Sequence, residues 1–207
     1  TKNRQEEIRW LFIIGQLHSK LGNNLEASEK FREVIKKGPP YELLFQAQLN
    51  RAKNYDVDLQ NPNKVFDELR AMLRDDKNYD NRDQIYFVMA EVAERLGDDA
   101  KVEEFLGKSI RVSTNNNAQK GLSYLKFGEI NFDNRLYPIA AAYYDSSYAS
   151  LPKDHKRYEE VGLKKQSLSA LVKNIEIIET QDSLQRIGAM TEKQRLAFVE
   201  KLIKKLE

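Results

Sequence analysis

Residues Leu11–Pro39 read LFIIGQLHSKLGNNLEASEKFREVIKKGP, and this stretch decides the fold. Large apolar residues recur three or four positions apart on both sides of a central turn, which is the spacing of one face of an α-helix. Gly22 stands just past the first apolar series, where a left-handed residue is favoured after a helix. We therefore predict two antiparallel helices, the second of which is stopped by Pro39.

The same pattern recurs twice further along the chain. Ala90 and Gly128 take the place that Gly15 has in the first copy, each directly after the second of two large apolar residues that are three positions apart. Two antiparallel helices approach closely only if a small side chain faces the partner helix, and large residues one turn away then fill the space between neighbouring pairs. These three positions therefore predict close helix–helix contacts.

This pattern resembles the tetratricopeptide repeat, a helical hairpin of about 34 residues. The resemblance is good over residues 8–41, 83–116 and 121–154. It implies an all-α fold, a solenoid of antiparallel helical hairpins over residues 1–154. Residues 42–80 fit the repeat less well, and we expect a hairpin with a stretched connection there. Its helices are expected from Tyr41 to about Tyr55 and from Pro62 to Arg74, with Ala47 as the small residue.

The pattern changes after residue 154, and residues 155–207 are expected to form a long capping helix followed by a C-terminal helix. We predict the long helix from His155 to about Glu179 and a break or bend at Gln181–Ser183. Thr191 with Gln194 forms a capping box that predicts the start of the last helix.

Composition excludes several classes of protein. Basic and acidic residues nearly cancel, 34 against 32, and they are interleaved along the predicted helices, which does not favour nucleic acid as a partner. The chain has no cysteine, so it has neither disulfides nor thiolate metal sites. No apolar run is long enough to cross a membrane. Because the chain starts at Thr1 within a polar run, we expect a piece of a longer or processed protein.

The sequence carries no recognisable catalytic motif. It has 2 histidines, and neither has the spacing of a metal site. A phosphate-binding glycine loop and a nucleophile elbow are both missing. We therefore predict a protein that is not an enzyme and has no metal or cofactor, and that binds another protein.

Solenoids of this family bind partners on the concave face, which first helices line. We assign the residues that face this surface by their spacing from the small residues on the first helices. They are a mixture of polar and apolar residues, which suits a protein partner. The set is Arg9, Phe12, Gln16, Ser19, Tyr41, Leu44, Gln48, Arg51, Gln84, Phe87, Glu91, Glu94, Leu122, Leu125, Glu129 and Phe132. An alternative reading is that neighbouring repeats bury Phe12, Phe87 and Leu125.

Several longer strings of the sequence point to a particular family. They are WLFIIGQLHSKLG (residues 10–22), PPYELLFQAQLNRA (39–52), DQIYFVMAEVA (83–93), NNNAQKGLSYL (115–125), YYDS (143–146) and LVKNIEIIET followed by QDSLQRIGAM (171–190). Together they resemble the PorW/SprE lipoproteins of the Bacteroidota type IX secretion and gliding-motility apparatus. The resemblance covers nearly the whole chain, as an interior piece of a longer family protein.

The resemblance implies a tetratricopeptide lipoprotein on the periplasmic side of the outer membrane. Such a protein would link the periplasmic ring components PorK and PorN to the translocon, tethered through a lipidated residue upstream of Thr1. The alternative from the repeats alone is a cytoplasmic tetratricopeptide adaptor or regulator that binds peptide segments of a partner.

Overall fold

Ten α-helices and one 3-10 helix follow one another in the computed structural model, which describes residues 2–55 and 61–206. No strand occurs in those residues, so the all-α prediction is confirmed. The first helices are α1 (Lys2–Lys20), α2 (Asn24–Lys36), α3 (Tyr41–Lys53), α4 (Pro62–Arg74), the 3-10 helix η1 (Asp76–Asn81) and α5 (Arg82–Arg95). The others are α6 (Asp99–Val112), α7 (Asn117–Asp133), α8 (Tyr137–Ser150), α9 (Tyr158–Gly188) and α10 (Glu192–Leu206).

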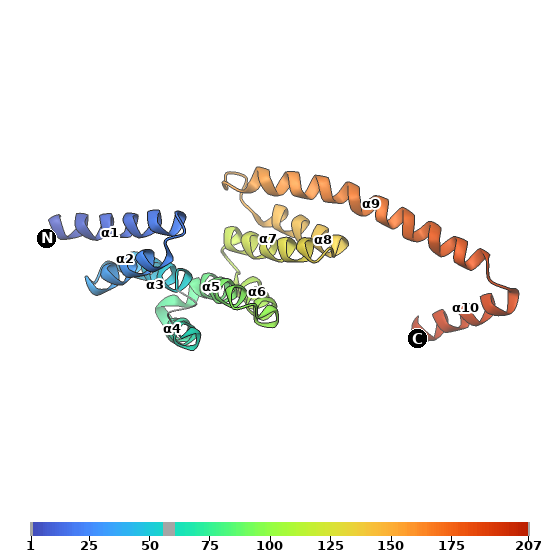
Figure 1. Ribbon diagram of the computed structural model, residues 1–207, viewed down its shortest axis with the longest axis horizontal. Helices are drawn as coiled ribbons and strands as arrows, with labels where there is room; N and C mark the ends of the chain where they lie inside the picture. The colour runs from blue at the N-terminus through green and yellow to red at the C-terminus, as the bar shows by residue number, and fades with distance from the viewer. Residues whose placement is uncertain (1, 56–60, 207) are drawn as a thin grey trace.

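Most of the packing joins helices that are adjacent in the sequence. Helix α1 packs with α2, α5 with α6 and α7 with α8, and these pairs connect through α2–α3, α6–α7 and α8–α9. Figure 1 shows α1 at one end of the molecule, the paired helices after it, and α9 running on beyond them toward α10. Contacts that are confined to neighbours are typical of a repeat array, in which each unit is buried by the next.

Small residues lie where paired helices approach most closely. A Cβ added at Gly15 would lie 2.9 Å from the Phe31 ring, and one added at Gly128 would lie 2.5 Å from the Tyr144 ring. The predicted close contact is therefore confirmed at both glycines. Ala90 is buried at the matching place in α5, with 2% of its surface exposed.

Three hairpins turn through a left-handed residue seven positions after the small residue. Gly22 has a φ of 78° and Gly97 a φ of 68°, at the places where the sequence predicted such turns. In the third hairpin this residue is Arg135, with a φ of 60°. A left-handed conformation costs a residue with a Cβ roughly 1–2 kcal/mol. The third hairpin therefore keeps the geometry of the other two at some cost in stability.

A buried polar cluster joins α5, α6 and α7. The Ser113 hydroxyl donates to the Asp83 carboxylate at 2.9 Å, and the Ser109 hydroxyl donates to the Asp83 carbonyl at 2.8 Å. Ser109 also lies 2.8 Å from the hydroxyl of Ser123 on α7. Burial raises the pKa of Asp83, although the hydrogen bond from Ser113 opposes this. Directional bonds of this kind fix the register between one hairpin and the next.

Helices α3 and α4 occur where the second hairpin was predicted, and their ends lie close to the predicted ones, but α3 packs mainly on α2 and α5. Ala47 of α3 is fully buried, but it packs with Phe31 and Val34 in the core of the first helix pair, so its close contact is with α2 and not with α4. The Asn61 side chain accepts a hydrogen bond from the Asn63 backbone N–H at 3.0 Å and caps α4, which then begins with Pro62. Of the expected connecting loop, residues 56–60 lie outside the described residues.

The predicted break at Gln181–Ser183 is wrong. Helix α9 runs without interruption from Tyr158 to Gly188, 31 residues. Glutamine, aspartate and serine each destabilise a helix by only roughly a few tenths of a kcal/mol relative to alanine. Unlike proline, they keep the backbone N–H that the helix needs as a donor. The helix ends instead at Gly188, and the predicted capping box follows, with the Thr191 backbone N–H donating to the Gln194 side chain at 2.9 Å.

We expect Gly128→Ala to destabilise the fold by about 1–3 kcal/mol, because the added methyl group would overlap the Tyr144 ring and force it to move. Urea denaturation followed by circular dichroism measures this difference. The matched control is Gly107→Ala in α6, where an added Cβ meets nothing within 4 Å. That change should stabilise the helix by about 0.5–1 kcal/mol. Equal effects of the two changes would contradict the close contact at Gly128.

Candidate functional site

The predicted partner-binding residues differ widely in their exposure. Arg9, Gln16, Glu94 and Phe132 are exposed, whereas Leu125 is fully buried. The Leu125 side chain lies in the core beneath α9 and is therefore not part of the surface. The other predicted residues are partly buried: Phe12, Ser19, Tyr41, Leu44, Gln48, Arg51, Gln84, Phe87, Glu91, Leu122 and Glu129.

Several of the partly buried residues are engaged within the fold. The Phe12 ring packs edge-on against Phe31 with centroids 5.4 Å apart, and Phe87 packs against the central core. The Tyr41 hydroxyl donates to Asn78 at 2.7 Å. Gln84 accepts a hydrogen bond from Gln46 at 3.2 Å. Phe12 thus joins α1 to α2, and the other three side chains connect α3 and α5 to their neighbours.

Ion pairs connect one first helix to the next. Lys53 of α3 lies 2.8 Å from the Glu91 carboxylate of α5, and Lys126 of α7 lies 2.7 Å from the Glu94 carboxylate of α5. We refer to these pairs, together with those of Glu129 described next, as the ion-pair ladder. The acidic residues predicted to meet a partner thus already have a cation of a neighbouring helix beside them.

Glu129 of α7 forms the last step of the ladder. Its carboxylate lies 2.9 Å from Arg157 and 2.8 Å from Lys164. Glu160 of α9 pairs with the same two cations, at 2.7 and 3.1 Å. Together with buried Val161, these charges hold the start of α9 against the last hairpin.

The charges shift the pKa values of both carboxylates. Burial tends to raise the pKa of Glu129, but hydrogen bonds and charges from Lys164 and Arg157 outweigh it, so the pKa lies below its ordinary 4.5. The hydrogen bond from Arg157 is the main cause that lowers the pKa of Glu160 to about 2. Both residues are therefore ionised at neutral pH.

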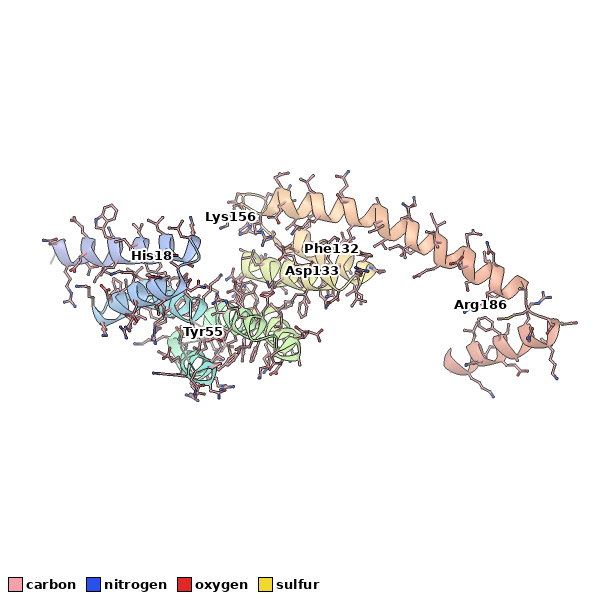
Figure 2. The ribbon with its side chains drawn as sticks, in the orientation of Figure 1. His18, Tyr55, Phe132, Asp133, Lys156 and Arg186 are labelled. Carbon is pink, nitrogen blue, oxygen red and sulfur yellow. The ribbon has the colours of Figure 1, made fainter. Side chains whose placement is uncertain are left out.

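A cleft of about 400 Å³ opens beside the ladder, and we call it the α7 cleft. It brings together the predicted Glu94, Glu129 and Phe132, and Figure 2 places Phe132 and Asp133 beneath α9. The full lining is Glu94, Lys126, Glu129, Ile130, Phe132, Asp133, Tyr144 and Lys164. Phe132 is 44% exposed, so its side chain is open to a partner at the edge of the cleft. The sequence-based set did not include the other five: Lys126, Ile130, Asp133, Tyr144 and Lys164.

The described residues hold no group of three metal-ligating side chains. In the same part of the chain, no helix has both the length and the apolar character needed to cross a membrane. A comparison of the sequence with protein-family models finds no match, and a comparison with curated proteins finds none either.

We expect Glu129→Gln to destabilise the fold at neutral pH by about 1–2 kcal/mol, because it removes the anion that two cations share. The folded pKa of Glu129 lies below its unfolded value, so this contribution is present above the unfolded pKa and is lost as the pH falls through the folded pKa. Urea titrations at pH 7 and at pH 3 should therefore show a large difference from the unsubstituted chain at pH 7 and a smaller one at pH 3.

The control for this change is Glu103→Gln, which removes an exposed carboxylate from α6. It should alter the free energy of unfolding by less than about 0.5 kcal/mol at neutral pH. An effect of Glu129→Gln at pH 7 no greater than this would show that the last step of the ladder does not stabilise the fold.

Proposed function

We propose that this chain is a non-catalytic module that binds an extended segment of a partner protein in the α7 cleft. The observation that carries the proposal is the exposed Phe132 ring beside Ile130, framed by charges of both signs. An apolar anchor site with a polar rim is the usual composition of a protein-binding surface. A partner would insert one apolar side chain against Phe132 and place polar groups beside Lys126 and Asp133.

We further propose that the hairpins are tetratricopeptide units. The small residue and the large residue that packs against it are sixteen positions apart in two hairpins, Gly15 with Phe31 and Gly128 with Tyr144. The third hairpin has Ala90 and Leu106 at the same separation, and both are buried. A common separation between small and large core residues supports one repeated unit with one register.

The longer sequence strings support a more specific proposal. We propose that the chain belongs to a PorW/SprE-type lipoprotein of the type IX secretion and gliding apparatus, on the periplasmic side of the outer membrane. The module would then help to link the ring components PorK and PorN to the translocon. The membrane tether would be a lipidated residue of the longer protein.

Phe132 is a better probe of the cleft than residues of the ladder. Glu91 pairs with Lys53, and Phe87 packs against the central core, so changes at either residue would also disturb the contact between α3 and α5. Phe132 makes one aromatic contact, edge-on with Tyr137 at 5.6 Å, it belongs to no core cluster, and 44% of its surface is exposed.

We expect Phe132→Ala to weaken capture of purified PorN at least about tenfold, because truncating an interface anchor costs about 2 kcal/mol or more. Biolayer interferometry with the immobilised chain measures this affinity, and circular dichroism checks that the helical content is unchanged. Ile139→Ala is the matched control, since Ile139 is 47% exposed on α8 and does not line the cleft.

The outcomes separate the two parts of the proposal. Equal affinity of the Phe132→Ala and Ile139→Ala variants would reject the α7 cleft as the binding site. If the unsubstituted chain does not bind PorN, the assignment of this partner is wrong.

A further inference from the structure

The charged residues that line the α7 cleft pair with one another, with one exception. Lys126 lies 2.7 Å from the Glu94 carboxylate. Lys164 lies 2.8 Å from the Glu129 carboxylate. The remaining charged residue of the lining is Asp133, which is exposed and forms no ion pair with any side chain that the structure describes. The lining therefore holds three carboxylates against two lysines, and its uncompensated charge is negative.

The place of Asp133 in the repeat makes this charge unusual. It stands five positions after the small residue of its hairpin, at the end of α7, which has no basic residue in its last turn. The other two hairpins have Lys20 and Arg95 at this place, in the last turns of α1 and α5. The partial negative charge of a helix C-terminus stabilises a basic side chain there and not an acidic one. The fold alone therefore favours a basic residue, and a residue that departs from such a local rule points to a binding role.

An apolar group and an acidic group stand at neighbouring positions of the cleft. Phe132 and Asp133 both line it, both are exposed, and Figure 2 shows them together beneath α9. Because α7 ends at Asp133, the partial negative charge of the helix C-terminus adds to the charge of the carboxylate. The ligand group that fits both residues is an apolar side chain close to a cation.

We propose that the partner segment carries a lysine or arginine close to the apolar side chain that packs against Phe132, and that Asp133 binds this cation. The inference rests on the proposed function of the α7 cleft and adds the charge of the segment that the cleft selects. An acidic segment is disfavoured at the same place, because its carboxylate would meet that of Asp133. The basic residue lies within two positions of the apolar one, since alternate side chains of an extended segment point to the same side, about 7 Å apart.

A library of short random peptides displayed on phage tests the proposal without naming a partner in advance. Peptides selected on the immobilised, unsubstituted chain should carry Lys or Arg within two positions of a large apolar residue. Peptides selected on the Asp133→Lys chain should carry Asp or Glu at that place instead. This variant is expected to fold, because Lys20 stands at the corresponding position of α1.

Fluorescence anisotropy with one selected peptide, synthesised with a label, measures the size of the effect. Asp133→Asn should weaken binding by roughly two- to fivefold at low salt, as expected for the loss of a solvent-exposed ion pair. The difference should shrink at high salt, because ions screen the pair. Asp154→Asn is the matched control, since Asp154 is exposed and does not line the cleft, and it should bind like the unsubstituted chain. The urea midpoint of Asp133→Asn should not fall below that of the unsubstituted chain, which separates a binding role from a structural one.

The outcomes distinguish this inference from the proposed function. The same basic preference on Asp133→Lys as on the unsubstituted chain overturns the role of Asp133, as does equal affinity of the Asp133→Asn variant for the peptide. The α7 cleft still stands in that case if Phe132→Ala no longer selects the apolar residue. If Phe132→Ala selects the same peptides as the unsubstituted chain, or if the unsubstituted chain enriches none, the cleft is not a peptide-binding site and both proposals fail.

Discussion

The close approach of two helices at a residue with almost no side chain is the constraint on which this structure depends. At Gly15 and Gly128 the facing helix places an aromatic ring where a Cβ would stand. The ring then fills the space that the missing side chain leaves, so the pair packs at interior density. This contact sets the distance between the helices of each hairpin, and the large residues around it set how hairpins stack.

The ion-pair ladder follows from that stacking. Once each hairpin is fixed, long charged side chains can reach from α3 and α7 to α5, and from the start of α9 to α7. Lys53 meets Glu91 and Lys126 meets Glu94 in this way. The α7 cleft lies at the last steps of the ladder, so charged residues line it together with Ile130, Phe132 and Tyr144.

Much of the fold could be predicted because the deciding features are local. Apolar spacing, glycine after a helix, and the Asn61–Pro62 start of α4 each act within a few residues. The left-handed turn of the third hairpin was not predicted, because its residue is Arg135 and an arginine does not indicate a left-handed conformation as a glycine does. The false break in α9 came from giving weight to polar residues that a solvated helix tolerates.

The candidate site was predicted less well, for a physical reason. Glu91, Glu94 and Glu129 do lie on the predicted first helices, but their cations come from other helices, 28 to 38 residues away in the sequence. No local spacing reveals such a partner. Leu125 shows the same limit. It is buried by α9, and the sequence of α7 does not indicate which of its faces α9 covers.

The length of α9 has a mechanical consequence. Only its first part is buried, with Val161 and Leu168 against the last hairpin, and roughly twenty residues extend beyond, a length of about 30 Å. This part projects from the molecule and is attached near the cluster of Glu129, Arg157 and Lys164. A tilt of α9 by about 10° at that cluster moves the C-terminal end of the helix by roughly 5 Å, given that rise per residue. Because these ion pairs are partly exposed to solvent, added salt weakens them and so loosens the attachment of α9 at this point.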